Sequence, residues 1–371
     1  MKTNSKIYIA GHKGLVGSAI TKSLTAKAYK NIIGRDINEL DLRDPNAVST
    51  FFETEKPEYV FLAAAKVGGI VANNTYRAEF IYDNLMIQNN VIHQASLHGV
   101  KKLLFLGSTC IYPRDCPQPM KEEYLLSGPL EYTNEPYAIA KIAGIRMCES
   151  YNIQYGTNFL SVMPTNLYGP NDNFDLEKSH VLPALIRKMH LGKCLEAEDW
   201  PALMNDFNKR PVNNINGTSS RNEIVSVLQK HGIIQIPQSG VQVEIWGSGN
   251  PMREFLWSED MADACVFVME NVNVSDLDKI LQSETMDESL AKEIRNQFLN
   301  IGTGTEISIK DLAHLVKEIA GFRGEIFFNR SKPDGTMRKL TDPGKLNSLG
   351  WKHNIEIYDG IRKLYQWYQE N

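Results

Sequence analysis

The chain has 371 residues, of which 42% are hydrophobic and 23% charged, a mix typical of a globular protein with one large or two smaller domains. Its 40 basic and 44 acidic residues leave a formal net charge of −4. Because no long block of one sign occurs, the charge pattern argues against a general nucleic-acid-binding or membrane-surface protein.

The cysteines and the N-terminal sequence indicate the cellular compartment of the protein. The five cysteines form no CxxC pair and no closely spaced framework, so we expect no zinc or other metal and a reducing environment; they are Cys110, Cys116, Cys148, Cys194 and Cys265. A short polar segment precedes the first predicted strand, with no signal-peptide pattern, and no apolar run approaches the roughly 20 residues that span a bilayer. These features predict a cytoplasmic protein.

The first half of the chain alternates between strand-like and helix-like segments. Short apolar runs predict strands at Ile7–Ala10, Asn31–Gly34, Tyr59–Ala65, Leu103–Gly107 and Asn158–Met163. Helical patterns lie between them, at Leu15–Ala28, Pro45–Lys56, Tyr76–His98 and Pro136–Tyr155. Continuous apolar strands joined by helices predict an α/β fold, in which a doubly wound parallel sheet is covered on both faces.

After Pro164 the pattern changes. A helix is predicted at His180–Leu191, followed by a polar, irregular region at about 196–240 with a short helix at Asn222–Gln229. Further strands are predicted at Val241–Trp246, Gln297–Gly302 and Glu325–Asn329, a helix at Ile309–Ala320, and loops at Gly247–Pro251 and Lys332–Gly335. The second half therefore predicts a smaller α+β domain.

A glycine cluster follows the first predicted strand and opens the first helix. Gly11, Gly14 and Gly17 have GxxGxxG spacing, with His12, Lys13, Leu15 and Val16 between them. Glycines at such a turn let the backbone approach a pyrophosphate at the helix N-terminus. The placement between a strand and a helix predicts a dinucleotide site, whereas an isolated cluster of this kind is often only a turn.

The second predicted strand ends in Gly34, Arg35 and Asp36. A guanidinium at this place can pair with the 2′-phosphate of NADP, so Arg35 favours NADP over NAD. The alternative is that Arg35 is solvated and Asp36 binds the ribose of NAD.

Three further residues suggest carbonyl chemistry. Tyr137 and Lys141 are four residues apart and share one helix face, where an ammonium is expected to lower the pKa of the phenol. Ser108 follows the fourth strand, at the carboxyl edge where α/β proteins bind ligands. A serine there can hydrogen-bond a substrate carbonyl while the tyrosine donates a proton.

This triad and its surroundings resemble the GDP-L-fucose synthase family of extended short-chain dehydrogenases/reductases. The matching segments are Phe61–Ile70, Gly107–Pro113, Asn134–Lys141, Met163–Pro170, Trp246–Phe255 and Lys332–Thr336. The resemblance implies an NADPH-dependent enzyme that epimerises GDP-4-keto-6-deoxy-D-mannose at C3 and C5 and then reduces its C4 ketone, giving GDP-L-fucose.

The resemblance also implies residue roles. Cys110 and His180 would exchange the protons at C3 and C5, beside the triad Ser108, Tyr137 and Lys141. Without the resemblance, Cys110 would be read as a small buried residue and His180 as an ordinary helix start.

Binding roles follow in the same way. Cofactor contacts are implied for Gly11, His12, Lys13, Gly14, Leu15, Val16, Gly17, Arg35, Leu106, Gly107, Lys141, Pro164, Thr165, Asn166, Leu167 and His180. Substrate contacts are implied for Lys188, Trp246, Arg253 and Asp334, although each alone has an ordinary structural explanation.

The sequence also predicts the limits of two domains and the oligomeric state. We expect an NADP-binding Rossmann domain at 1–165, with about 254–272 and 296–303, and a substrate domain at 166–253 and 304–371. Relative to the family pattern, about 196–240 and 277–295 are predicted insertions, for which we expect no catalytic role. A homodimer is expected, in which the helices Tyr76–His98 and Pro136–Tyr155 pair with their copies.

Three other functions remain open. A nucleotide-sugar 4-epimerase or 4,6-dehydratase of the same superfamily would share the triad, but a 4-epimerase would consume no net NADPH. A non-catalytic NADP-binding regulator is the third alternative, against which the intact triad argues.

Overall fold

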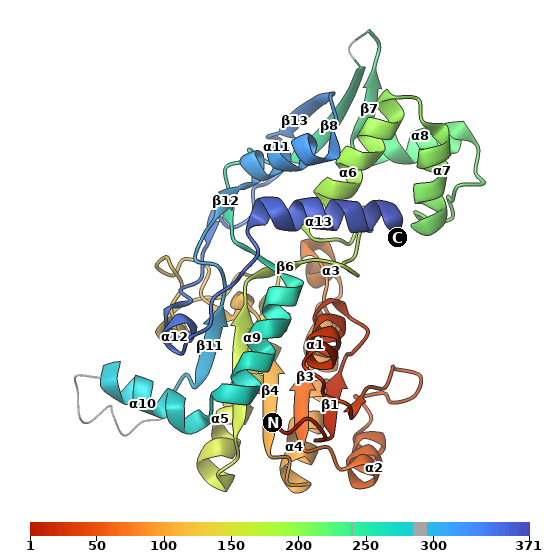
Figure 1. Cartoon of the computed structure of the whole chain (residues 1–371). Helices are drawn as coiled ribbons and strands as arrows, with labels where there is room; N and C mark the ends of the chain where they lie inside the picture. Colours follow the sequence, from red (N-terminus) through yellow and green to blue (C-terminus); the bar gives the residue numbers. More distant parts are fainter. Residues whose placement is uncertain (239, 285–294) are drawn as a thin grey trace. The chain divides into compact units, whose positions relative to one another are not determined.

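The computed structural model describes residues 1–238, 240–284 and 295–371, which divide into two compact units (Figure 1). The first unit comprises Met1–Leu167, Glu254–Thr305 and Leu340–Ile355. The second comprises Tyr168–Arg253, Glu306–Lys339 and Glu356–Asn371. The chain thus passes between the units several times.

A six-stranded sheet forms the centre of the first unit. Its strands are β1 (Ile7–Ala10), β2 (Ile32–Ile33), β3 (Tyr59–Leu62), β4 (Lys102–Leu106), β5 (Phe159–Pro164) and β11 (Phe298–Ile301). The order is β11-β5-β4-β3-β1-β2 and every pair is parallel. The strand order reverses at β1, where doubly wound sheets bind ligands. The predicted doubly wound α/β fold is confirmed.

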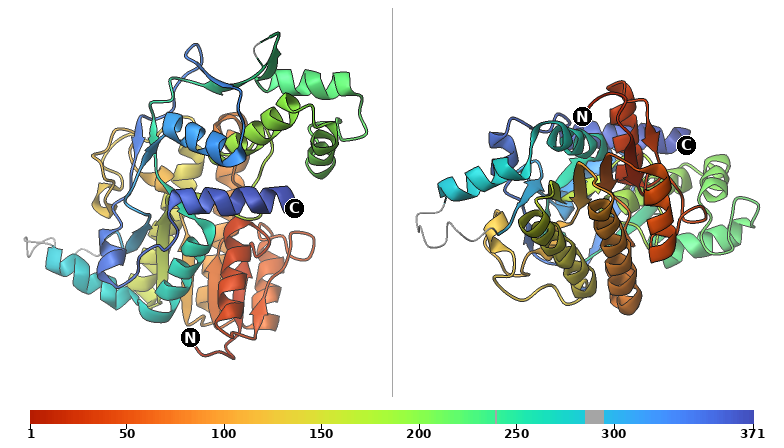
Figure 2. Two further views of the ribbon diagram at one scale, coloured as in Figure 1. Left: turned by 45° about the horizontal axis from the view of Figure 1, so that its top comes forward. Right: turned by 90° about the horizontal axis from the view of Figure 1, so that it is seen from below.

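Alternating side chains of each strand bury both faces of the sheet. On β1, Ile7 and Ile9 pack in one core with helices α1 (Leu15–Ala26) and α9 (Ser258–Asn271). Tyr8 and Ala10 belong to the core of the other face, which is covered by α2 (Pro45–Glu55), α4 (Arg77–Leu97) and α5 (Glu135–Tyr155), as the view from below shows (Figure 2). Burial on both faces explains why these strands read as continuous apolar runs.

The remaining elements of the first unit are short. They are α3 (Ile70–Thr75), the 3₁₀ turns η1 (Thr109–Ile111) and η2 (Glu122–Tyr124), β10 (Phe255–Trp257), α10 (Val274–Glu284) and α12 (Gly344–Ser348). Strand β10 pairs with β6 (Asn166–Tyr168). Most of the predicted insertion at 277–295 falls outside the described residues, apart from its beginning in α10.

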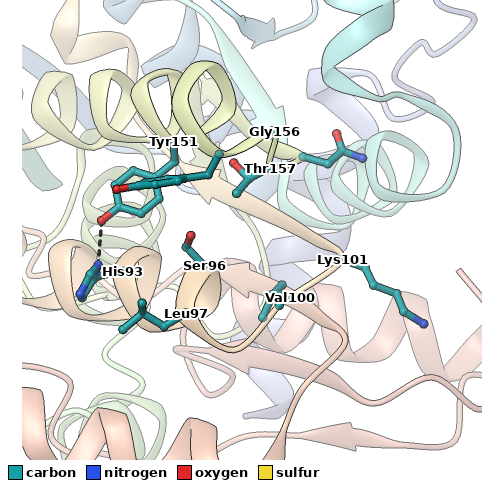
Figure 3. A pocket seen from close by; sticks show the side chains of 11 residues that line it. His93, Ser96, Leu97, Val100, Lys101, Tyr151, Gly156 and Thr157 are labelled. Atoms are coloured by element: carbon teal, nitrogen blue, oxygen red, sulfur yellow. Dashed lines mark hydrogen bonds between the residues drawn. The ribbon is translucent and has the colours of Figure 1, made fainter.

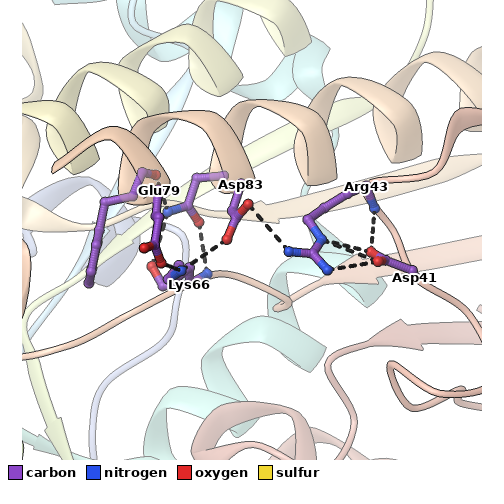
Figure 4. Close-up of polar contacts among 7 residues, drawn as sticks. Asp41, Arg43, Lys66, Glu79 and Asp83 are labelled. Atoms are coloured by element: carbon purple, nitrogen blue, oxygen red, sulfur yellow. Dashed lines mark hydrogen bonds and ion pairs between the residues drawn. The ribbon is translucent and has the colours of Figure 1, made fainter. Parts of the chain in front are cut away.

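A chain of ion pairs fixes the loop that follows β3 (Figure 4). Lys66 in this loop pairs with Glu79 and, at 3.1 Å, with Asp83, both on α4. Asp83 also pairs with Arg43, which makes a bidentate contact with Asp41 in the loop after β2. These contacts fasten two loops of the carboxyl edge to one helix, which limits their movement next to the glycine turn.

The second unit has a mixed three-stranded sheet. Strand β8 (Gly240–Trp246) pairs antiparallel with β7 (Ile233–Ile236) and parallel with β13 (Glu325–Asn329). Helix α6 (Val181–Glu196) contacts β7 and β8, and α11 (Ile309–Ala320) contacts both α6 and α13 (Ile357–Glu370). A small sheet of β12 (Ile307–Ser308), β9 (Met252–Arg253) and β14 (Arg338–Lys339) completes this unit.

The region at 196–240 is more regular than predicted. The predicted short helix at Asn222–Gln229 is confirmed as α8 (Arg221–Lys230), but the structure also has α7 (Trp200–Lys209) and β7, which were not predicted. Pro201 stands in the first turn of α7, and Asp199 caps the helix by accepting from the amide of Ala202. Proline is favoured at such a position, since its missing N–H would have no partner in the helix.

A buried ion pair joins α7 to α6. Arg187 and Asp206 are 1% and 3% exposed, and the Nε of Arg187 donates to the Oδ1 of Asp206 over 3.0 Å. Asp206 also accepts from Tyr368 on α13 and pairs with Arg210 at 3.5 Å. The segment that was predicted as an insertion is therefore part of the core of the second unit.

Replacing Asp206 by alanine is expected to destabilise the protein by about 3–5 kcal/mol, because it leaves the Arg187 charge buried without its carboxylate. Asp199→Ala, which removes only a helix cap, is the control and should cost about 1 kcal/mol. Urea unfolding of both variants measures the difference. Equal losses in the two variants would contradict a core role for Asp206.

One segment lies in a different unit from the predicted one. Leu340–Ile355 belongs to the first unit, whereas the sequence predicts it in the second domain. It is placed there by contacts such as the amide of Thr341 donating to the buried carboxylate of Glu254 over 2.8 Å. Among the described residues, no helix is long and apolar enough to cross a membrane.

Candidate active site

The glycine turn lies where the strand order reverses. Gly11 has φ +84, and a Cβ on it would lie 2.8 Å from the amide nitrogen of Ala64, in the loop after β3. A Cβ on Gly17 would overlap the carbonyl oxygen of Gly11. No side chain caps the N-terminus of α1, whose first amides are thus left for a ligand. This cradle fits the pyrophosphate of a dinucleotide.

Gly17→Ala is expected to lower the free energy of unfolding by about 1–3 kcal/mol and to weaken NADPH binding, because the new methyl group forces the turn open. Gly14→Ala is the matched control for stability, since its Cβ would meet the Gly11 oxygen at 3.5 Å, an ordinary contact. Thermal unfolding of both variants measures the loss of stability, and NADPH fluorescence titration of Gly17→Ala measures the loss of affinity. If the two variants unfold at the same temperature, the turn is not a tight cradle.

The groups predicted to select the cofactor lie at the end of β2. Arg35 donates to Glu55 on α2 over 2.7 Å and to the carbonyl of Gly34 over 3.0 Å, and about a third of its side chain is exposed. Lys13 from the glycine turn donates to Asp36 over 2.8 Å. Asp36 is thus paired with a lysine, and the cations Lys13 and Arg35 follow the neighbouring strands β1 and β2, a charge pattern that suits a 2′-phosphate.

The triad residues come together at the carboxyl edge of β4. Ser108 follows β4 and caps η1 by accepting from the amide of Cys110 over 3.3 Å. Tyr137 and Lys141 lie one turn apart on α5, and the Lys141 ammonium lies 5.7 Å from the centre of the tyrosine ring. Lys141 is 3% exposed and donates to the carbonyl of Leu106 over 2.8 Å.

The electrostatics of this site differ from the expectation. Burial raises the pKa of Tyr137 above its usual value, the nearby Cys110 adds to this, and a hydrogen bond with Ser108 opposes it. Burial also lowers the pKa of Lys141 to about 7. The expected lowering of the tyrosine pKa by the lysine is therefore wrong for this structure, because Lys141 faces a backbone carbonyl and shares the buried environment. The phenol keeps its proton at neutral pH, as a proton donor must.

Cys110 faces the same site. Its side chain is only partly buried, whereas the other four cysteines are buried. Its sulfur accepts a hydrogen bond from the Nδ2 of Asn134 over 3.3 Å, and it acts electrostatically on Tyr137. The thiol thus lies beside the predicted proton donor.

The segment of implied cofactor contacts from Pro164 to Leu167 begins at the end of β5. Thr165 is 5% exposed, and both its hydroxyl and the Nδ2 of Asn166 donate to the backbone carbonyl of Glu254, over 3.4 and 2.8 Å. The Glu254 carboxylate is fully buried and accepts from the amides of Thr303 and Gly304. Sequence reasoning missed this glutamate, whose carbonyl accepts from two donors of the segment and whose carboxylate is held by the loop at Thr303 and Gly304.

The remaining predicted residues belong to the second unit. His180 precedes α6, and its side chain is exposed to solvent. Desolvation by the surrounding protein atoms lowers the pKa of its imidazole. Lys188 on α6 donates to the carbonyl of Glu244 on β8 over 3.0 Å, and burial lowers its pKa to about 8.

Three of the four predicted substrate residues form a cluster. Asp334 accepts hydrogen bonds from the amide and the hydroxyl of Ser248, over 2.8 and 2.7 Å. Ser248 lies two residues after Trp246 in the sequence. Asp334 also raises the pKa of Arg253, against a larger lowering by burial. Trp246 is 59% exposed, and the ammonium of Lys332 lies 5.1 Å from its ring centre. Lys332, which sequence reasoning read only as part of a loop, adds a second cation beside an exposed aromatic face, a combination suited to an anionic nucleotide.

A hollow elsewhere in the first unit is not part of this site. It has a volume of about 530 Å³ and lies between the C-terminal ends of α4 and α5, where His93 and Tyr151 hydrogen-bond over 2.8 Å (Figure 3). Its lining also includes Lys101 and Asn158, which precede β4 and β5. It therefore lies at the amino edge of the sheet, whereas ligands of such sheets bind at the carboxyl edge.

Known proteins resemble the whole chain. GDP-L-fucose synthase 1 of Arabidopsis thaliana is 47% identical over 368 residues, which cover 99% of this chain and 94% of that protein. GDP-L-fucose synthase of Escherichia coli (strain K12) is 45% identical over 369 residues, covering 100% and 98%.

Solved structures agree in fold. A GDP-6-OMe-4-keto-L-xylo-heptose reductase from C. jejuni has a TM-score of 0.89 and 48% identity, with 100% and 99% of the two chains covered. MlghC, a GDP-mannoheptose C4 reductase from Campylobacter jejuni with NADP bound, has a TM-score of 0.83 and 46% identity, with the same coverage. The profile of the NAD dependent epimerase/dehydratase family matches residues 7–222 and 210–281. The chain belongs to this family of extended short-chain dehydrogenases/reductases and, within it, to the group that contains the GDP-L-fucose synthases.

Proposed function

We propose that the chain is a bifunctional enzyme that converts GDP-4-keto-6-deoxy-D-mannose to GDP-L-fucose, by epimerisation at C3 and C5 and NADPH-dependent reduction at C4. The observation that carries the proposal is the partly exposed thiol of Cys110 beside Tyr137 and Ser108. A plain reductase needs only the proton donor and the hydroxyl that binds the carbonyl. The thiol adds a base that can remove protons from the carbons on either side of the same ketone.

The residues of the first unit suit both steps. Ser108 and Tyr137 hydrogen-bond the C4 carbonyl, which stabilises the enolate formed when Cys110 takes a proton from C3 or C5. The resemblance assigns the return of a proton on the opposite face of the ring to His180, which belongs to the second unit. Bound NADPH supplies the hydride that reduces C4. Tyr137 then donates its proton to the C4 oxygen, and Lys141 fixes the nicotinamide ribose.

The binding residues have separate tasks. The glycine turn holds the pyrophosphate of the dinucleotide, while Arg35 and Lys13 neutralise its 2′-phosphate, a choice of NADP supported by the relative with NADP bound. Arg253 and Lys188 bind the phosphates of the GDP-sugar, Trp246 stacks on an apolar part of it, and Asp334 accepts from a hydroxyl or base.

A second candidate substrate is a GDP-4-keto-heptose. It is favoured by the 46–48% identity to reductases whose names specify GDP-heptoses, as high as the identity to the fucose synthases. The two substrate classes differ at C6, which is a methyl group in the 6-deoxy sugar but carries an oxygen substituent and a further carbon in the heptose.

The test is NADPH oxidation with each GDP-4-keto-sugar, together with identification of the product. We expect the larger kcat/KM with GDP-4-keto-6-deoxy-D-mannose and GDP-L-fucose as product. A preference for the heptose would replace the substrate but keep the chemistry. Turnover without net NADPH consumption would point to a 4-epimerase instead.

We also propose a cytoplasmic homodimer. None of the five cysteines, all of which the structure describes, forms a disulfide, which suits a reducing compartment. On α4 and α5, Tyr82, Ile139 and Ile153 are 43–60% exposed, and paired copies of these helices would cover such apolar side chains. Light scattering should give twice the mass of one chain, and Ile153→Glu should shift it towards that of one chain. A wild-type protein of single-chain mass would contradict the dimer.

A further inference from the structure

Asn134 stands where it would normally cap a helix, but its side chain is used elsewhere. It directly precedes α5, and asparagine is among the most favoured residues at that position because its side chain accepts from the helix amides. No such hydrogen bond forms here. The backbone of Asn134 is held by other bonds, since its amide donates to Glu131 over 3.2 Å and its carbonyl accepts from Ala138 over 3.0 Å.

The carboxamide of Asn134 is directed at Cys110. Its Nδ2 donates to the sulfur over 3.3 Å. Its Oδ1 is buried and has no donor among the residues that the structure describes. Within that part of the chain, the sulfur is therefore the one hydrogen-bond partner of this side chain. This arrangement costs stability, because the helix loses a cap and a buried oxygen is left without a donor. The cost indicates that the Asn134 side chain is placed for its contact with the sulfur of Cys110.

We propose that Asn134 is a positioning residue that stabilises the thiolate of Cys110 and holds it towards the ketone. The inference rests on the proposed function, in which Cys110 removes the protons at C3 and C5. A sulfur anion is the form that can take a proton from carbon, and an N–H donor stabilises that anion more than the neutral thiol. Tyr137 is the titratable neighbour that acts on Cys110, and the backbone amide of Cys110 is already bound to Ser108.

Alkylation of the thiol tests this without any substrate. Cys110 is partly exposed and the other cysteines are buried, so iodoacetamide should modify one site, and Cys110→Ser should abolish the modification. In Asn134→Ala we expect about tenfold slower alkylation at neutral pH and a rate profile moved by about one unit to higher pH. Asn134→Asp should slow alkylation further, because a carboxylate in the same place repels the thiolate. Thr133→Val is the control, since its hydroxyl contacts Glu131 and not the sulfur.

The same variants separate the inference from the proposed function. If Asn134→Ala keeps the wild-type alkylation profile while it folds and binds NADPH normally, the inference is overturned. If the profile moves and deuterium exchange at C3 and C5 slows by a similar factor, both stand. A shifted profile with unchanged exchange supports the contact between Asn134 and Cys110, but it removes Cys110 as the base of the proposed reaction.

Discussion

Tyr137→Phe is expected to lower kcat for reduction of the C4 ketone by about 10²–10⁴-fold, because the variant lacks the proton that the C4 oxygen receives. NADPH binding should change little, since the glycine turn, Arg35 and Lys141 remain. Stopped-flow measurement of NADPH oxidation with GDP-4-keto-6-deoxy-D-mannose gives the rate, and fluorescence titration gives the affinity for NADPH.

The reason for expecting so large an effect is the burial of the phenol. Burial raises the pKa of Tyr137, so the side chain holds its proton over the neutral range and donates it only when negative charge develops on the substrate oxygen. Phe80, whose ring lies 6.4 Å from that of Tyr137, offers a control, because Phe80→Leu alters packing beside the phenol but removes no proton. A Tyr137→Phe enzyme within about tenfold of wild type would exclude the phenol as the donor.

The second large effect is expected at the thiol. Cys110→Ser should slow deuterium exchange at C3 and C5 in D₂O by about 10²–10⁴-fold, because a serine hydroxyl is a much poorer base than a thiolate. Reduction of the ketone should persist, since Ser108, Tyr137 and Lys141 are unchanged. The reduced product should then keep the starting configuration at C3 and C5, which NMR of the isolated sugar nucleotide reveals.

Cys116→Ser is the matched control for this experiment. Cys116 is 9% exposed and belongs to the core packed on α2, α4 and α5. Its replacement is expected to affect stability but not the ratio of exchange to reduction. If Cys110→Ser and Cys116→Ser exchange deuterium equally fast, the thiol at position 110 is not the base.

Local patterns were sufficient for the main strands and helices of the first half of the chain. Ile7–Ala10 is an apolar run bounded by polar residues and glycine, and the structure has β1 with these limits. The helical pattern that begins at Pro45 is α2, whose start is fixed by the Asp44 carboxylate accepting from the amides of Asn46 and Ala47. In both cases the residues that decide the structure are neighbours in sequence.

Nonlocal contacts explain most of what sequence reasoning missed. The helix α7 is stabilised by Arg187 and Tyr368, which are 19 and 162 residues from Asp206. Nothing in the composition of 196–240 indicates partners so far away. Leu340–Ile355 likewise joins the first unit through contacts with distant residues such as Glu254.

In the active site too, local sequence patterns predict the residues, whereas their contacts and pKa values depend on the folded structure. Ser108, Tyr137 and Lys141 follow from the end of a strand and the spacing along one helix. The pKa directions did not follow, because they depend on burial and on Lys141 bonding to the carbonyl of Leu106 rather than acting on the phenol. Asn134 was visible in a matching segment, but its contact with the sulfur depends on how η1 packs beside the start of α5.

One reaction of the wild-type enzyme tests the central claim that a single site both exchanges protons and transfers hydride. GDP-4-keto-6-deoxy-D-mannose is incubated in D₂O with unlabelled NADPH, and the product is analysed by NMR and mass spectrometry. The account predicts GDP-L-fucose with deuterium at C3 and C5 and protium at C4. A reduced product without deuterium at C3 and C5 would contradict it and leave only a reductase.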